Sequence, residues 1–337
     1  IRKQLESRVE KIRFYSRSLS AYSVEIEPAN VRAVEALPFV KLFRDVGYRT
    51  RNKINPGYEE VPENLSKTTD FYGNSREQLE QLNVIKVHES GITGRGVRLG
   101  IIDTGFFKEH LAFEYMITNG HLIDEYDFIN GDNNVQNEAS TDTIHGSSQH
   151  NHGTAALSCI VGHIPENAMG SAYNVDVLLA KTEDIGSETR IEEDYYVAAL
   201  EWLEANGAEI ISSSLGYRDF DNFEYSFDEL DGETAITTKA ANWIYDRGVL
   251  LVTAAGNDAS RFPDGGIITP GDAKGALTVG AVDNTGRIAS FSSHGPTADG
   301  RIKPEVCARG VRTYVANDYR TDYFRYSNGT SDRKSVV

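Results

Sequence analysis

The chain has 337 residues, with 34 Lys and Arg against 50 Asp and Glu, which gives a formal net charge of −16. This length accommodates one large catalytic domain and a small one. The negative charge disfavours nucleic acid and anionic membranes as partners, and no run of residues is apolar and long enough to span a bilayer. Cys159 and Cys307 are too few for a disulfide framework. We expect two buried thiols, with one bridge between them as the alternative.

Residues 1–50 form a small α+β unit in their sequence pattern. Apolar residues alternate over 11–27 as they do in a strand, Pro28 begins a helix that Pro38 ends, and 39–46 is predicted to be a returning strand. An ordinary small α/β domain is one interpretation of this unit. Residues 51–75 are polar, with prolines and glycines, and are predicted to be a linker.

From residue 76 to residue 337, apolar segments alternate with helical ones. Strands are predicted at 97–102, 175–180, 208–213, 249–254 and 276–282, and helices at 191–206 and 234–246. The helix at 191–206 carries three acids in its first turn, where negative charge suits the helix dipole. Near-continuous apolar strands separated by helices predict a doubly wound α/β fold, with a mostly parallel sheet covered on both faces. Ligands of such sheets bind at the carboxyl ends of the strands.

Three short stretches carry residues suited to catalysis. Ile102-Asp103-Thr104-Gly105 ends an apolar strand, His152-Gly153-Thr154 opens a helix of small residues, and Ser-Asn-Gly-Thr-Ser at 327–331 presents the hydroxyl of Ser331. Asp, His and Ser in this order form one of the chain orders of a catalytic triad. Together the stretches resemble the subtilisin-like serine proteases, or subtilases.

The resemblance implies a serine endopeptidase acting on polypeptides, with a role for each residue. Ser331 would attack the peptide carbonyl, His152 would act as general base, and Asp103 would fix the tautomer of His152. Asn257 would donate to the oxyanion beside the backbone N–H of the serine. The remaining residues implied to bind substrate are Ser213, Ser214, Leu215, Gly216, Ala254, Ala255, Gly256 and Gly186.

Two further loops are predicted to contact a ligand, one the substrate and the other a metal ion. Glu183 and Asp184 would form an acidic rim of the substrate groove that favours basic side chains, with a solvated loop as the alternative. The loop at 130–134 offers oxygen ligands for a structural calcium ion. No cofactor is expected to be required for the chemistry, and no catalytic metal.

The resemblance also extends to the N-terminal residues, and it implies where the protein is located. Residues 1–50 resemble the subtilase propeptide, which would be a partner of its own catalytic domain, and the family implies a secreted or cell-envelope bacterial protein. The chain begins with Ile1 and ends six residues after Ser331, so it is interpreted as a fragment open at both ends. After Ser331 come Asp332, Arg333 and Lys334, where subtilases continue with small and apolar residues on a helix. This departure predicts a mobile Ser331 and no protease activity for the chain as written.

Two other functions stay open. An inactive subtilase-like fragment or pseudoenzyme would keep the fold and only bind peptides. A metal-dependent hydrolase would use His145, His150 and His152, because closely spaced imidazoles bind zinc, although they lack the His-Glu-x-x-His arrangement on a helix. A chelator and a serine-directed phosphonate would distinguish the metal-dependent enzyme from the serine enzyme.

Overall fold

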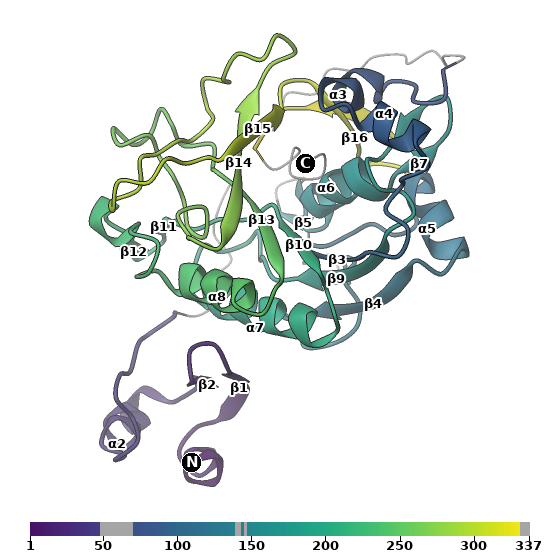
Figure 1. Cartoon of the computed structure of the whole chain (residues 1–337). Helices are drawn as coiled ribbons and strands as arrows, with labels where there is room; N and C mark the ends of the chain where they lie inside the picture. The colour runs from purple at the N-terminus through teal and green to yellow at the C-terminus, as the bar shows by residue number, and fades with distance from the viewer. Residues whose placement is uncertain (48–69, 139–142, 145–146, 331–337) are drawn as a thin grey trace.

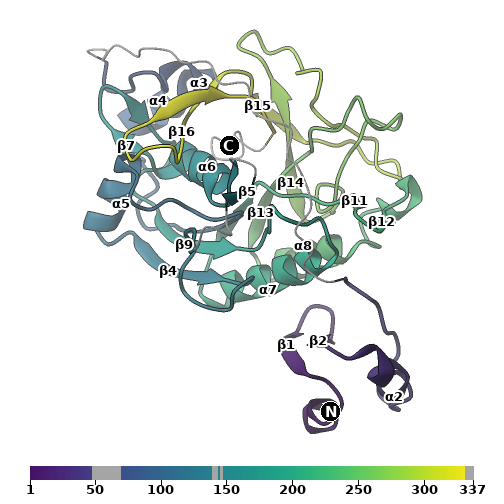
Figure 2. The same ribbon diagram turned by 180° about the vertical axis from the view of Figure 1, so that it is seen from behind.

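The structure is a computed structural model and describes residues 1–47, 70–138, 143–144 and 147–330. A large domain with a central sheet lies beside a small N-terminal unit, and the helices α7 (Ile191–Ala205) and α8 (Ile236–Tyr245) lie on the side of the sheet that faces the unit (Figures 1 and 2). The helix α6 (Asn151–Val161) covers the opposite face. No helix of the described residues is long and apolar enough to cross a membrane.

The central sheet has seven parallel strands in the order β15-β14-β13-β10-β3-β9-β4. The strands β3 and β10 lie side by side, but the chain leaves them in opposite directions: after β3 it continues to β4 and β9 on one side, and after β10 to β13, β14 and β15 on the other. That switch point opens a crevice at the carboxyl ends of the strands. In sheet order, the strands are Val306–Arg309, Ala276–Val282, Leu250–Ala254, Ile210–Ser213, Arg98–Asp103, Asp176–Lys181 and Leu122–Asp127.

Side chains of the strand β3 divide between two hydrophobic cores. Leu99 and Ile101 pack into the core shared with α6, whereas Ile102 packs into the core shared with α7 and α8. This division follows from the alternation of side chains along a strand, and it confirms a sheet covered on both faces. The five predicted strands and two predicted helices of this domain are present, with ends that differ by at most two residues.

The N-terminal unit differs from its prediction. It contains α1 (Arg2–Glu6), an antiparallel hairpin of β1 (Lys11–Ser16) and β2 (Ala21–Glu25), the short helix η1 (Pro28–Asn30) and α2 (Val31–Glu35). The single strand predicted over 11–27 is therefore wrong, since a turn at 17–20 folds it into two.

The strand predicted at 39–46 is also absent. Its apolar residues Phe39, Val40 and Phe43 pack instead against the small core of Leu5, Ile26 and Val34.

Shorter elements surround the sheet. They are α3 (Arg76–Gln81), α4 (Val84–Glu89), η2 (Leu111–Phe113), α5 (Glu114–Thr118), β5 (Thr143–Ile144), β6 (Ser147–Ser148), β7 (His163–Ile164), β8 (Ala168–Met169), β11 (Asp219–Phe220), β12 (Phe223–Glu224), η4 (Phe227–Glu229), β16 (Thr313–Ala316) and β17 (Phe324–Ser327).

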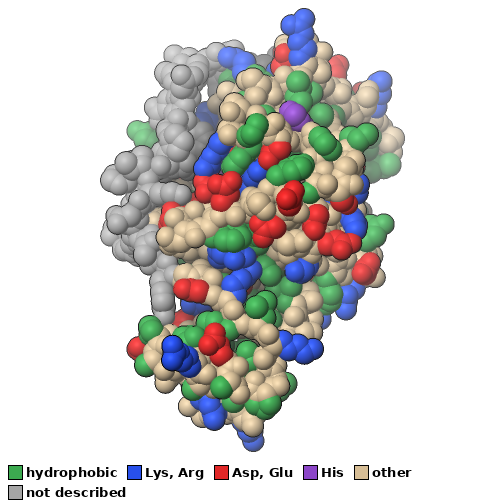
Figure 3. All heavy atoms as spheres, turned by 90° about the vertical axis from the view of Figure 1, so that its left-hand side faces the viewer, with side chains coloured by type: hydrophobic (Ala, Val, Ile, Leu, Met, Phe, Trp, Pro, Cys, Tyr) green, Lys and Arg blue, Asp and Glu red, His purple; other side chains and the backbone are tan. Residues whose placement is uncertain are grey.

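Acidic side chains gather on the face seen in Figure 3, in keeping with the negative charge of the chain. Of the two cysteines, Cys159 is buried as expected, whereas Cys307 is exposed on the edge strand β15.

Candidate active site

Asp103 and His152 meet at the switch point of the sheet. Asp103 is the last residue of β3 and is completely buried, and His152 lies in the first turn of α6. The Nδ1 atom of His152 lies 2.6 Å from Oδ1 of Asp103, which also accepts the backbone N–H of Thr104 at 2.7 Å. Because a carboxylate only accepts, the bond places the imidazole proton on Nδ1 and makes Nε2 the basic nitrogen.

A glycine allows α6 to approach β3 this closely. A Cβ atom on Gly153 would come within 2.1 Å of the carbonyl oxygen of Gly105 and 2.9 Å of Cβ of Asp103. No side chain fits in this space, so the small residue beside His152 fixes the distance between the carboxylate and the ring.

Asn257 follows the carboxyl end of β13, the strand next to β10 in the sheet. Gly256 turns the chain with a φ of +110°, a conformation that glycine adopts readily. The amide oxygen of Asn257 accepts the backbone N–H of Thr330 at 2.8 Å and the Thr330 hydroxyl at 3.0 Å. This leaves the amide NH₂ of Asn257 as its donor. Ser331 lies outside the described residues, directly after Thr330.

The segments expected to bind substrate follow adjacent strands. Ser213, Ser214, Leu215 and Gly216 continue from β10, and Ala254, Ala255 and Gly256 continue from its neighbour β13. Gly216 lies so close to Ile268 that a Cβ atom would come within 2.3 Å of its Cδ1. Gly186 follows β9, and its N–H donates to Asp184 at 3.0 Å. The fold thus gathers these residues at one edge of the sheet.

The acidic rim expected at Glu183 and Asp184 is wrong. Asp184 is buried and accepts the N–H of Gly186, and the carboxylate of Glu183 accepts the hydroxyl of Tyr217 at 3.1 Å. Burial, together with the charge of Glu188, raises the pKa of Glu183 to about 8. Asp184 is buried, and the half-buried Glu183 is bonded to Tyr217, so the two do not form an exposed charged rim.

Two histidines of the loop proposed for a metal, His150 and His152, lie in different environments. His145 lies outside the described residues. His150 lies 3.4 Å from Oδ2 of Asp318, accepts the backbone N–H of Asn137 at 3.2 Å and packs against the ring of Phe107. In the described part of the chain, the side-chain groups close enough to share a metal ion consist of carboxylates alone, at Asp127, Asp132 and Glu138, and at Glu183, Glu188 and Glu192. Among the described residues, His150 and His152 therefore do not belong to a cluster of the kind that a zinc hydrolase needs.

The loop expected to bind calcium is internally satisfied. Asp127, just before it, is completely buried and pairs with the ammonium of Lys181 at 2.8 Å. Asp127 also accepts the backbone N–H groups of Ile129 and Asn130, and Asp132 accepts that of Asn134 at 2.8 Å. Lys181 thus neutralises the buried carboxylate of Asp127, although Asp127, Asp132 and Glu138 lie close enough to one another to share an ion.

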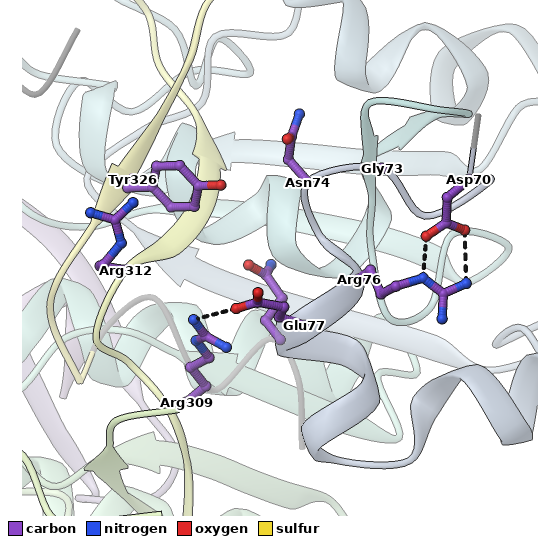
Figure 4. Close-up of a pocket in the computed structure, with 9 residues that line it drawn as sticks. Asp70, Gly73, Asn74, Arg76, Glu77, Arg309, Arg312 and Tyr326 are labelled. Carbon is purple, nitrogen blue, oxygen red and sulfur yellow. Dashed lines mark hydrogen bonds and ion pairs between the residues drawn. The ribbon is translucent and has the colours of Figure 1, made fainter. Parts of the chain in front are cut away.

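A polar pocket of about 300 Å³ lies apart from the predicted site residues. It is bordered by α3 and by the segments around β16 and β17, and two of its lining residues, Arg309 and Glu77, form an ion pair at 2.9 Å (Figure 4). A second ion pair joins two other lining residues, Arg76 and Asp70. None of the residues predicted for catalysis or substrate binding lines this pocket.

Sequence reasoning missed two features of the site. It assigned Glu192 to the first turn of a helix for its effect on the dipole, although the residue is completely buried beside Glu183. It also attached no role to Thr330, which holds the amide of Asn257. The sequence carried no signal for either feature, since Glu192 is followed directly by the acids Glu193 and Asp194.

Comparison with known proteins agrees with this geometry. The family described as "Subtilase family" matches residues 94–332. Subtilisin DY of Bacillus licheniformis is 32% identical over 248 residues, which cover 73% of this chain and 75% of that protein. An alkaline protease of Shouchella clausii is 27% identical over 315 residues, covering 93% of this chain and 66% of that protein.

Among solved structures, a cold-adapted subtilisin-like serine proteinase superposes with a TM-score of 0.52 at 22% identity, over 73% of each chain. This likeness supports the fold. The family match and the identity to Subtilisin DY go further, and they show that the chain belongs to the subtilase family of serine endopeptidases.

Proposed function

We propose that this subtilase hydrolyses peptide bonds of polypeptides with Asp103, His152 and Ser331 as its catalytic triad. The observation that carries the proposal is the 2.6 Å contact between Asp103 and Nδ1 of His152 at the switch point of the sheet. With its proton held on Nδ1, the ring can take the proton of the Ser331 hydroxyl at Nε2 and later return it to the leaving amine. Asp103 stabilises the charged ring that forms in between.

Asn257 is proposed to stabilise the oxyanion of the tetrahedral intermediate. The amide oxygen of Asn257 accepts two hydrogen bonds from Thr330, the residue before the nucleophile. The NH₂ group of Asn257 is therefore held close to Thr330. A donor fixed in this way requires little reorganisation when charge develops on the carbonyl oxygen. The backbone N–H of Ser331 would be the second donor.

The substrate is proposed to lie extended between two segments. Residues 213–216 follow β10, and the segment containing Gly186 follows β9, so the two flank the end of β3, where Asp103 lies. Main-chain pairing with an extended peptide gives affinity with little dependence on sequence. The substrates are therefore expected to be polypeptides, with preferences set by the side chains around residues 213–216 and 254–256.

The N-terminal unit is proposed to act as the propeptide of this domain. Its hairpin turn binds the carboxylate of Glu201 on α7 through Ser16, Arg17 and Ser18, and the match to the alkaline protease, over 93% of the chain, extends into this unit. Maturation would cut the linker between the two parts. Secretion, which is typical of the family, is the proposed location.

A fluorophosphonate probe tests the serine mechanism in a protein that continues after Ser331 with small and apolar residues, because the chain as written, with Asp332, Arg333 and Lys334 at these positions, is expected to be inactive. We expect labelling of this parent protein, none of Ser331→Ala, and strongly reduced labelling of Asp103→Asn, because its ring adopts the wrong tautomer. Peptide hydrolysis without labelling, abolished by a chelator and restored by zinc, would instead support a metal-dependent hydrolase. Peptide binding with neither labelling nor hydrolysis would support a pseudoenzyme.

A further inference from the structure

The side chain of Ile268 lies between the two segments that follow β10 and β13. A Cβ atom on Gly216 would come within 2.3 Å of Cδ1 of Ile268 and within 2.7 Å of its Cγ1, and a Cβ atom on Gly256 would come within 3.1 Å of the same two atoms. Gly216 ends the segment at 213–216, and Gly256 ends the segment at 254–256. One isoleucine therefore occupies the space onto which a glycine of each segment opens.

Backbone hydrogen bonds hold Ile268 between these segments. Its N–H donates to the carbonyl oxygen of Ala255 at 3.3 Å, and its own carbonyl oxygen accepts the N–H of Gly271 at 2.7 Å. The next residue, Thr269, pairs with Tyr217 in both directions, at 2.8 and 3.0 Å. Because the residue is tied to both segments, its backbone cannot withdraw without breaking these bonds.

Ile268 differs from its neighbour Ile267 in what it packs against. Ile267 is completely buried and belongs to the core shared with α7 and α8. Ile268 is only 9% exposed, yet it belongs neither to that core nor to the core shared with α6. Consecutive side chains of extended backbone point to opposite sides. The side chain of Ile268 is therefore directed away from the core and toward the two glycines.

The cleaved bond would bring a substrate side chain to the same space. In the proposed function, on which this inference rests, Asn257 donates to the oxygen of the carbonyl under attack. The Cα atom of the residue before the cleaved bond is attached to that carbonyl carbon, so its side chain enters the enzyme close to Asn257. Gly256 directly precedes Asn257, and an extended peptide paired with 213–216 runs along Gly216. The side chain before the cleaved bond is therefore directed at the space that Ile268 occupies.

We propose that Ile268 restricts this enzyme to bonds that follow a small residue, Gly, Ala or Ser. A larger side chain, such as that of Phe or Leu, needs the volume that Cδ1 and Cγ1 of Ile268 already fill. Overfilling a packed site forces side chains and backbone to shift, which costs free energy. The walls cannot supply the room, because the residues that face Ile268 from the two segments are already glycines.

The alternative is that Ile268 only packs between the glycines and the substrate side chain stays in solvent. The two interpretations differ in what a smaller residue at 268 does. If Ile268 sets the specificity, shortening it opens a space that a large substrate side chain fills. If its role is only structural, shortening it lowers the Tm and leaves the preference between substrates unchanged.

The test compares two tetrapeptide p-nitroanilides that differ only in the residue before the cleaved bond, Ala in one and Phe in the other. The enzyme is the protein that continues after Ser331 with small and apolar residues. We expect kcat/KM to be higher for the Ala peptide by on the order of 100-fold. Ile268→Ala should raise kcat/KM for the Phe peptide at least about tenfold and change that for the Ala peptide less than about threefold. The ratio of the two values does not depend on how much of each protein is folded.

Two further variants keep the result interpretable. Ile268→Val removes only Cδ1 and should give a smaller gain for the Phe peptide, in case Ile268→Ala does not fold. Ile267→Val is the matched control, because it removes one methyl group from the core and should lower the Tm without changing the ratio. The proposal is overturned if the parent cleaves the Phe peptide as fast as the Ala peptide, if neither variant at 268 changes the ratio, or if Ile267→Val changes it as much.

A binding measurement separates this proposal from the proposed function. If the parent neither cleaves the peptides nor reacts with a fluorophosphonate, the serine mechanism fails. Fluorescent tetrapeptides ending in Ala or Phe are then titrated into Ser331→Ala, with and without Ile268→Ala, and followed by anisotropy. Tighter binding of the Ala peptide, with a gain for the Phe peptide in the double variant, would still support the role of Ile268. Equal binding of both peptides to both proteins would overturn it.

Discussion

Glu201 is expected to decide how tightly the N-terminal unit binds the catalytic domain. One of its carboxylate oxygens accepts Ser16 Oγ at 2.7 Å, Ser18 N at 2.9 Å and Ser18 Oγ at 2.7 Å, and the other accepts Arg17 N at 2.8 Å. Glu201 is only 7% exposed. Although burial raises its pKa, the N–H groups and hydroxyls of the hairpin turn lower it more, so the pKa of Glu201 lies below its usual value.

The cost of Glu201→Gln follows from these contacts. Glutamine keeps the shape and one acceptor oxygen, but it presents NH₂ to the backbone N–H of Arg17 and loses the charge. A hydrogen bond to a charged group contributes about 1.5–3 kcal/mol, so we expect docking to weaken by about 2–3 kcal/mol. This corresponds to a rise of roughly 30- to 140-fold in the inhibition constant.

The assay adds the segment 1–47, as a separate peptide, to enzyme cut in the linker and measures inhibition of peptide hydrolysis. Any cost of folding the segment is common to wild type and variant, so the ratio of inhibition constants reports on Glu201 alone. Glu204→Gln is the control. Its single bridge to Arg17, at 2.9 Å, is more exposed, and its loss should change inhibition by less than about fivefold.

A ratio below threefold for Glu201→Gln, with the Tm of the cut enzyme unchanged, would refute the reasoning. It would mean that the apolar contacts of the hairpin, rather than the captured carboxylate, hold the unit. No inhibition of the wild-type enzyme at micromolar segment would count against the propeptide assignment itself.

Three further outcomes are expected. Asn257→Ala should lower kcat with little change in KM, on the order of 100- to 1,000-fold, a range established for an oxyanion donor in subtilisin itself; an unchanged kcat would contradict the oxyanion role. Gly153→Ala should lower the Tm and the rate of probe labelling together, because the added methyl group would meet the carbonyl of Gly105 at 2.1 Å; an active variant of wild-type stability would show that α6 can move. The free energy of unfolding should fall as the pH rises from about 4.5 to about 8, because a carboxyl whose pKa is raised to about 8 at Glu183 keeps its proton more tightly in the folded state. The other ionisable groups around it are Glu188, Glu192, Asp184, Asp103 and Tyr217, and denaturant titrations at several pH values measure the slope; a rise in stability over this window would contradict the assignment.

The sequence by itself determined the architecture of the large domain. Its strands are apolar over nearly their whole length because both faces of the sheet are buried, and this pattern is visible without any structure, as at 276–282. The chain order of Asp103, His152 and Ser331, each beside small residues, likewise suggested the family before the fold was known. These signals are local, since each depends on a residue and its immediate neighbours.

Only the tertiary structure decided which charges are buried and what they contact. Glu192 and Glu201 both lie on α7 and look alike in the sequence, yet one joins a buried acidic cluster and the other is captured by a hairpin turn some 183 to 185 residues away. The same holds for 39–46, whose alternating pattern fits a strand but whose apolar side chains pack into a small core. The sequence pattern cannot tell a buried charge from an exposed one, or a strand from an irregular segment with the same apolar residues. The free energy of each side chain depends on the distant residues packed against it.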